Sequence, residues 1–324
     1  MFNIKEYRNV IERALSDYAY GQNPTELYAP IHYVIGLGGK RLRPLLVGLS
    51  YHLFADDWQK TTEGGIAVEI FHNFTLLHDD IMDKAPLRRG MPTVHQKWND
   101  SIAILSGDVM LIIVYEILTK IESHRLKEIL ERFNLCAKEV CEGQQWDMNF
   151  ESLESVPLET YISMIRQKTA VLLGFSLALG AILADAPITT VNQLYEIGVS
   201  MGISFQLKDD LLDVFGQSEK FGKQVGGDII VNKKTFLLIK ALELSKGELR
   251  EELLHWLSLK EFDATEKVAK VSEIYKQLGI IEITYLEIEQ YYEQGLRLIN
   301  DLDVSEDRKS LLINFMKELM NREN

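Results

Sequence analysis

The sequence predicts an all-α fold, in which one large helical bundle takes up the whole chain. Apolar residues recur at spacings of three and four, for example at Ile102, Leu105, Val109 and Ile112, which is the period of an amphipathic helix. The alternating pattern of β-strands is hard to find, and the hairpin dipeptides Asn-Gly and Asp-Gly are absent. The last proline is Pro187, so the remainder of the chain contains no residue of this helix-breaking type.

Helices are expected, in chain order, at 3–19, 40–54, 61–83, 101–121, 125–148, 158–184, 189–215, 233–245, 265–277, 279–301 and 305–321. The helix at 61–83 contains the largely apolar run Ile70–Leu77, and the helix at 189–215 contains Ile203–Leu207. The helix at 279–301 repeats its apolar residues at helical spacing. The helix at 158–184 is so apolar that we expect it inside the bundle.

Three linkers stand out by their glycine, proline and basic residues, namely 36–44, 84–93 and 216–228. None is rich enough in serine and proline to separate domains. Residues 1–324 are therefore predicted to form a single domain.

The longest apolar stretch, Ala170–Ala184, is about 15 residues long and is interrupted by two glycines and a serine. A transmembrane helix needs about 20 apolar residues, so no transmembrane segment is expected. The N-terminal residues carry charges early and lack the apolar core of a signal peptide. These features predict a soluble protein of the cytoplasm.

The composition is that of a globular protein, with 46% apolar and 26% charged residues. Asp and Glu number 48 against 35 Lys and Arg, which gives a net charge of −13. Nucleic-acid binders usually carry a basic surplus, so nucleic acid is not expected as a partner. An anionic ligand would need a local basic cluster or a bound cation.

Two Asp-Asp-x-x-Asp motifs carry the strongest chemical signal: Asp79, Asp80 and Asp83, and then Asp209, Asp210 and Asp213. Residues four apart share one face of a helix, so these carboxylates repel one another unless a cation lies between them. Each motif follows an apolar run, so it ends a core-facing helix and does not lie on a solvated face. Clusters of carboxylates favour hard cations, above all Mg²⁺ that also binds substrate phosphates.

The linkers supply basic residues that suit phosphate groups: Lys40, Arg41, Arg43, Arg88, Arg89, Lys223, Lys233 and Lys234. Arginine guanidinium groups match the geometry of phosphate oxygens. Two acidic motifs that face each other across a helical cavity would hold a diphosphate through bridging metal ions.

The chain resembles the trans-isoprenyl diphosphate synthases, the polyprenyl synthetase family. The matching segments are GGKRLRP at 38–44, FHNFTLLHDDIMD at 71–83, RRG at 88–90, KT at 168–169, FQLKDDLLD at 205–213 and FGKQVGGD at 221–228, followed by NKKT at 232–235. Together they cover Gly38–Thr235 in order. The resemblance implies an all-α homodimer of the isoprenoid synthase type, with its active site in a deep central cavity.

The resemblance also implies roles for individual residues. The six aspartates would bind about three Mg²⁺ ions together with the diphosphate of an allylic substrate. The grip on that diphosphate would be completed by Arg88, Lys168, Lys223 and Lys233. The diphosphate of isopentenyl diphosphate would be bound by Lys40, Arg43, His72 and Arg89. Lys168, Thr169 and Gln206 would lie near the developing carbocation.

The chemistry implied is the ionisation of an allylic diphosphate, followed by attack of the isopentenyl double bond on the cation. Bound cations stabilise the departing diphosphate, which is also the strong base closest to the proton that leaves. Walls that exclude water protect the cation. One departure from the family pattern is Asn232, where many relatives have glycine. A second is the C-terminal MNREN, which has a single arginine where some relatives have a basic tail.

Phe74 lies five residues before the first motif and Thr75 four before it. In the family, a large aromatic residue at the former position limits elongation, and no insertion separates Asp80 from Asp83 here. The pattern is most like that of geranylgeranyl diphosphate synthases, which make a twenty-carbon product. A farnesyl diphosphate synthase, with fifteen carbons, is the alternative, and ordinary core packing also explains Phe74.

Three further alternatives belong to other classes. Two Glu-x-x-His motifs, Glu69 with His72 and Glu252 with His255, are compatible with a di-iron carboxylate protein, but this interpretation leaves both aspartate motifs unexplained. A terpene cyclase would lack the complete second motif and the GGKRLRP segment. An inactive partner subunit would be expected to have lost some of the aspartates or basic residues.

Overall fold

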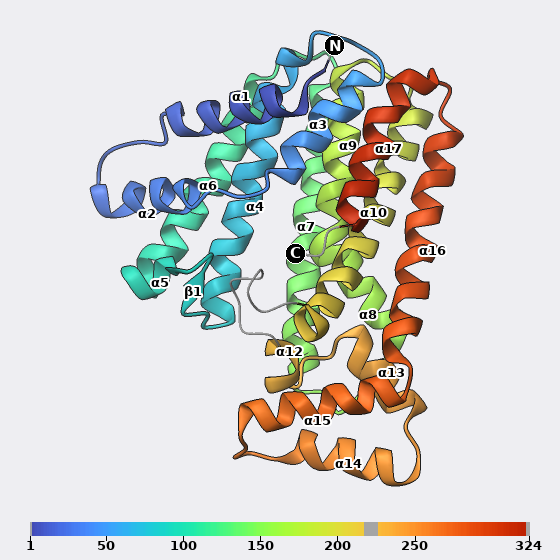
Figure 1. Ribbon diagram of the computed structural model, residues 1–324. Helices are drawn as coiled ribbons and strands as arrows, with labels where there is room; N and C mark the ends of the chain where they lie inside the picture. The colour runs from blue at the N-terminus through green and yellow to red at the C-terminus, as the bar shows by residue number, and fades with distance from the viewer. Residues whose placement is uncertain (1, 217–225, 322–324) are drawn as a thin grey trace. The chain divides into compact units, whose positions relative to one another are not determined.

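The computed structural model describes residues 2–216 and 226–321, and in these residues the chain is helical apart from one small hairpin (Figure 1). The predicted all-α class is therefore confirmed. The chain forms two compact units. The first contains the residues up to Cys136 with Leu172–Gly198 and Ile299–Leu312, and the second contains Ala137–Val171, Val199–Leu298 and the residues from Ile313 onward.

The first unit is organised around α4 (Thr62–Met82), which packs against α3 (Leu42–His52) and α6 (Asp100–Lys120) (Figure 1). Its other elements are α1 (Ile4–Asp17), α2 (Thr25–Gly36), the 3₁₀ turn η1 (Trp58–Thr61), β1 (Leu87–Arg88), β2 (Met91–Pro92) and α5 (Val94–Lys97). The interior of α4 is apolar, with Ile66, Ile70 and Phe71 at most 5% exposed. Its C-terminal end carries the first aspartate motif.

The second unit contains α8 (Leu158–Ile165), the π-helical turn η2 (Arg166–Ala170), α12 (Gly227–Ile230), α13 (Phe236–Leu244), α14 (Gly247–Ser258) and α15 (Ala264–Gln277). Here α15 packs against α12, α13 and α14. The remaining helices are each divided between the two units: α7 (Leu126–Glu151), α9 (Val171–Leu183), α10 (Ile188–Phe215), α16 (Ile280–Asn300) and α17 (Glu306–Asn321).

The helices expected from apolar periodicity are confirmed to within a few residues at each end. The longer helices α2 and α14 were not predicted, and neither were the one-turn helices α5 and α12. Helix α2 contains Pro30, a residue that usually interrupts a helix because it lacks the backbone N–H. It forms because Ile31, Val34 and Ile35 on one face are buried, so tertiary packing outweighs the local cost. Helix α14 buries few apolar side chains and is otherwise strongly charged, so its apolar stripe is narrow.

Helix α9 is the buried helix that the apolar stretch predicted. Ser50 on α3 donates a hydrogen bond to the Leu177 carbonyl at 2.6 Å, and a Cβ on Gly180 would lie 2.2 Å from the Val47 carbonyl oxygen. Glycine is needed at this close approach of two helices. Asp100–Lys120 and Leu158–Leu183 are long and apolar enough to cross a membrane, but core helices of soluble proteins also meet this criterion, and 78% of the second window is buried.

The hairpin pairs Leu87 with Pro92 and Arg88 with Met91 in antiparallel register. Its turn residues, Arg89 and Gly90, have φ values of 54° and 76°, so both lie in the left-handed region that a tight two-residue hairpin requires. The Arg-Arg-Gly sequence of the linker at 84–93 therefore forms a defined turn.

Candidate active site

The first aspartate motif lies at the end of α4, where Asp83 caps the helix and donates its N–H to the Asp79 carbonyl at 2.8 Å. The Asp80 side chain is only 5% exposed, and both of its oxygens accept hydrogen bonds from Arg88 at 2.6–2.9 Å. Burial raises the pKa of Asp80, and the Arg88 guanidinium offsets this only in part. Asp79 is half-buried and Asp83 is exposed, so these two carboxylates are the accessible ones.

A basic cluster lies in the same unit, around His72 on α4. Burial lowers the pKa of His72 well below its ordinary value, and the positive charges of Arg43 and Arg89 lower it further. The Arg89 guanidinium packs against Gly39, where an added Cβ would lie 2.9 Å from its Nη2 atom. Three of the four residues predicted to bind isopentenyl diphosphate are thus brought together. The fourth, Lys40, is exposed just before α3.

Arg41 has a different role from its basic neighbours. It is 2% exposed, and it bonds Glu69 at 2.7 Å and Glu12 at 2.9 Å. This buried guanidinium joins α1 to α4, so Arg41 is structural. Because Glu69 is oriented towards Arg41, the Glu69–His72 spacing is explained without a di-iron centre.

The second aspartate motif lies near the end of α10 in the other unit. Asp210 is 6% exposed. It accepts a hydrogen bond from Tyr161 at one oxygen and from Gln206 Nε2 at the other, at 2.9 Å. Burial, with the nearby charge of Asp228, raises the pKa of Asp210 to about 7. Asp209 and Asp213 are less buried, so this motif repeats the arrangement of the first.

The Lys-Thr pair lies in the π-helical turn η2, a type of turn that is frequent at functional sites. Thr169 Oγ1 donates to Gln206 Oε1 at 3.0 Å, which links this turn to α10. Glycines on two other helices fit closely against the turn. A Cβ on Gly143 of α7 would lie 2.3 Å from the Lys168 nitrogen, and one on Gly202 of α10 would lie 2.4 Å from the Ala170 Cα.

Asp147 on α7 pairs with two of the predicted site lysines, Lys168 and Lys233. Its carboxylate lies 2.6 Å from Lys168 Nζ and 3.8 Å from Lys233 Nζ. Burial alone would raise the pKa of Asp147, but the two ammonium groups lower it below its ordinary value. The carboxylate therefore fixes two cationic groups that the family resemblance assigns to one diphosphate.

Two of these contributors, Asp147 and Tyr161, were not among the predicted site residues. Tyr161 lies seven residues, or about two helical turns, before Lys168, which is a spacing that could have pointed to it. Asp147 is one of several acids in its helical segment, which also carries Glu142 and Glu151, and no local pattern distinguishes it. Lys223 and most of the FGKQVGGD segment lie outside the described residues.

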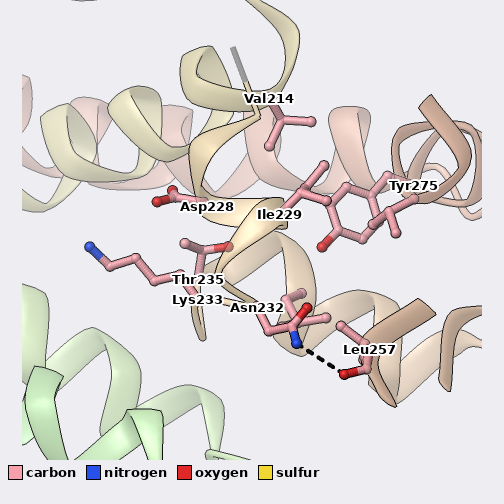
Figure 2. A pocket seen from close by; sticks show the side chains of 10 residues that line it. Val214, Asp228, Ile229, Asn232, Lys233, Thr235, Leu257 and Tyr275 are labelled. Atoms are coloured by element: carbon pink, nitrogen blue, oxygen red, sulfur yellow. Dashed lines mark hydrogen bonds between the residues drawn. The ribbon is translucent and has the colours of Figure 1, made fainter. Parts of the chain in front are cut away.

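The loop that carries Lys233 borders a small pocket, shown in Figure 2. The volume open to the centre of a water molecule in this pocket is about 10 Å³. The pocket is therefore large enough for roughly one water and too small for a substrate. Asp228 and Lys233 extend to one side of the loop in Figure 2, while Asn232 points towards Leu257 on the other. The backbone N–H of Asp228 donates to Asp213 Oδ2 at 2.9 Å.

The predicted chain-length residues lie on α4 within the first unit. Phe74 is 9% exposed, and its ring centroid lies 4.8 Å from that of His78 and 5.7 Å from that of Phe71. Thr75 is half-buried and donates to the His72 carbonyl at 2.8 Å.

Within the described residues, no group of three or more His, Cys, Asp or Glu side chains is close enough to form a metal site by itself. The metal-binding role of the aspartates stays a prediction. The donor set fits Mg²⁺, which takes one or two carboxylates and completes its octahedron with water and substrate phosphates.

A helical fold with two such aspartate motifs, a π-turn lysine and a basic cluster agrees with the isoprenoid synthase class that the sequence resemblance implies. The sequence profile described as polyprenyl synthetase matches residues 24–278. The chain therefore belongs to the polyprenyl synthetase family, and the predicted class of enzyme, an isoprenyl diphosphate synthase, is confirmed.

Individual relatives share nearly the whole chain. The geranylgeranyl pyrophosphate synthase of Geoglobus acetivorans is 34% identical over 95% of each chain. A crystal structure of a geranylgeranyl pyrophosphate synthase superposes with a TM-score of 0.95 at 40% identity, covering 100% of both chains. The Corynebacterium glutamicum geranylgeranyl pyrophosphate synthase, solved with isoprenyl diphosphate and magnesium, has a TM-score of 0.88 at 26% identity and covers 99% of this chain and 100% of its own.

Proposed function

We propose that this chain is a geranylgeranyl diphosphate synthase, which condenses isopentenyl diphosphate with dimethylallyl, geranyl or farnesyl diphosphate and releases diphosphate. The observation that carries the proposal is the arrangement shared by both aspartate motifs. In each, the middle carboxylate is the most buried and accepts a hydrogen bond from a side chain, Arg88 or Tyr161, while the outer two are more exposed. Relatives of the same name over nearly the whole chain support the product.

Mg²⁺ would be held by the four outer carboxylates, Asp79, Asp83, Asp209 and Asp213. Asp80 and Asp210 would instead maintain the positions of the helix ends through Arg88 and Tyr161. About three bound Mg²⁺ ions would supply the positive charge that stabilises a departing diphosphate.

The allylic diphosphate is assigned to Arg88, Lys168, Lys223 and Lys233, and isopentenyl diphosphate to Lys40, Arg43, His72 and Arg89. The convergence of Arg43 and Arg89 on His72 supports the second set. Since the pKa of His72 is low, its imidazole is neutral near pH 7 and would donate an N–H to a phosphate oxygen. The net positive charge there would come from the arginines.

Ionisation of the allylic C–O bond leaves a carbocation, which is stabilised by nearby oxygen atoms that carry partial negative charge and is destroyed by reaction with water. The Thr169 and Gln206 oxygens, joined by a 3.0 Å hydrogen bond, would face this cation. Lys168 would hold the departing diphosphate, to which the proton finally moves.

A chain growing along α4 would meet Phe74 one to two turns before the first motif. Its buried ring, packed between Phe71 and His78, supports a floor suited to a twenty-carbon product, with Thr75 beside it. His78 lies nearer the motif than Phe74 does. A floor at His78 would stop elongation earlier, so a fifteen-carbon product is the second candidate.

The whole chain is proposed to act as one domain, in a cytoplasmic homodimer. Support for the dimer comes from α6, where Ile104, Leu105 and Ile112 are 45%, 57% and 59% exposed. Several large apolar side chains exposed on one helix are a feature of protein interfaces.

The metal assignment is tested with Asp79→Ala and Asp209→Ala, measured by Mg²⁺-dependent diphosphate release from farnesyl and isopentenyl diphosphates. We expect each to lower turnover at least about a hundredfold, because charge stabilisation of the leaving group is lost. Circular dichroism should stay unchanged. The exposed Asp301→Ala is the control; a metal-site variant that retains its rate would contradict the assignment.

A further inference from the structure

The loop that carries Lys233 is tied to the end of α10 at its beginning. The Gly226 N–H donates to the Asp213 carbonyl at 2.7 Å, and the Lys233 N–H returns to the Asp228 carbonyl at 2.9 Å. These bonds fix the backbone on the α10 side. The other side of the loop, away from the aspartates, needs a separate attachment.

Asn232 provides that second attachment. Its φ of 54° is left-handed, a conformation that glycine adopts most readily and asparagine tolerates. Glycine would satisfy the backbone here but would offer no side chain. The Asn232 side chain uses both polar atoms, because Nδ2 donates to the Leu257 carbonyl at 3.0 Å and Oδ1 accepts from Lys267 Nζ at 2.7 Å. One residue thus joins the loop to both α14 and α15. Figure 2 shows its bond to Leu257 on α14.

Lys267 on α15 is fully buried, at 0% exposed. Its ammonium also donates to the Ile230 carbonyl at 3.2 Å and lies 4.1 Å from the centre of the Phe262 ring. These hydrogen-bond acceptors are neutral oxygens, and burial lowers the pKa of the ammonium. Burying a charge against neutral partners is costly. In return the ammonium holds two oxygens of the loop, the Ile230 carbonyl and Asn232 Oδ1.

We propose that Asn232 and Lys267 are positioning residues that hold Lys233 in place for the allylic diphosphate. The inference rests on the proposed function of Lys233. The Asn232 and Lys233 side chains leave the loop on opposite sides (Figure 2), so a fixed Asn232 sets the direction of its neighbour. Lys233 Nζ then lies 3.8 Å from the Asp147 carboxylate that also holds Lys168.

The test compares the KM values of Asn232→Gly and Lys267→Met for farnesyl and isopentenyl diphosphates with those of the wild type. Asn232→Gly keeps the left-handed backbone and removes both side-chain bonds, so it carries the test even if Lys267→Met does not fold. We expect the KM for the allylic substrate to rise about tenfold, since small displacements of a positioned group are costly. The KM for isopentenyl diphosphate should change less than twofold.

The matched control is Lys309→Met, because Lys309 is 3% exposed and bonds the Asn300 carbonyl at 2.8 Å in the other unit. It should lower the melting temperature without changing either KM. Lys233→Ala is measured in parallel. If it raises the allylic KM while Asn232→Gly leaves that KM within twofold of wild type, the positioning inference is overturned and the Lys233 assignment stands. If Lys233→Ala has no effect, the assignment fails and the inference fails with it.

Discussion

Buried charges in this chain are held by specific partners, and those partners separate structural residues from candidate site residues. Arg41 forms ion pairs with Glu12 and Glu69, whereas the positive charge of its neighbour Arg43 lowers the pKa of His72. Asp80 and Asp210 are bonded by Arg88 and Tyr161. At the residue scale, sequence motifs identify a group of candidates, and burial decides which of them can reach a ligand.

Replacing Asp147 by asparagine should remove stability that depends on pH. The lysines lower the pKa of Asp147 in the folded protein, so its stabilising contribution is complete above the unfolded value of about 3.9 and is lost as pH falls through the folded value. We expect Asp147→Asn to unfold at lower urea than wild type at pH 7, with the difference shrinking below about pH 4. A difference that stays constant with pH would contradict the ion-pair explanation.

At the scale of elements, the π-turn η2 is the feature that periodicity could not predict. A single wider turn leaves no mark on the apolar pattern, so the sequence indicated one continuous helix at 158–184. The glycines that accommodate it, Gly143 and Gly202, lie on other helices, with Gly143 lying 23 residues before the turn begins and Gly202 lying 32 residues after it ends. Close backbone contacts of this kind depend on tertiary structure, as the burial of Pro30 in α2 also does.

Gly202→Ala should lower both kcat and the unfolding temperature, whereas a matched control should lower the unfolding temperature alone. The added Cβ would meet the Ala170 Cα at 2.4 Å and displace the turn that carries Lys168 and Thr169, so we expect kcat to fall at least about tenfold. Gly198→Ala is the control, because its Cβ would meet the Gly174 Cα at 2.6 Å, away from the turn. Both should unfold at lower temperature by calorimetry. Equal kcat values for the two variants would show that the turn position is unimportant.

Phe74→Ala should lengthen the product, because the cavity left by its ring on α4 would admit further isoprene units. Chromatography of the dephosphorylated products should show chains longer than twenty carbons. Phe133→Ala removes a 1% exposed ring that packs on Phe71 at 5.1 Å, and it should destabilise the protein without changing product length. An unchanged product from Phe74→Ala would mean that this ring is core packing only.

At the scale of the molecule, the net charge of −13 does not attract anions. Anionic substrates would therefore have to be bound by local basic clusters and bound cations. The order of helices and both aspartate motifs could be read from the sequence, because apolar period and motif spacing are local properties. The Asp147 pairing and the Asn232–Lys267 attachment could not, since they join segments that lie far apart in sequence. Asn232 was recognised only as a departure from the family pattern.

The exposed face of α6 should mediate dimer formation. Leu105→Asp places a charge on a residue that is 57% exposed within an apolar face, and desolvating that charge would oppose association. Light scattering should then give about half the mass of the wild type. Leu286→Asp, at a residue 67% exposed on α16, should leave the mass unchanged. A wild-type mass for Leu105→Asp would exclude this face as the interface.

The central claim is tested most directly by a product assay. Purified protein and Mg²⁺ are mixed with labelled isopentenyl diphosphate and with dimethylallyl, geranyl or farnesyl diphosphate in turn, and chain lengths are read by chromatography. We predict geranylgeranyl diphosphate as the final product from each primer. Accumulation of farnesyl diphosphate would contradict the product assignment, and no condensation with any primer by folded protein would contradict the proposed activity itself.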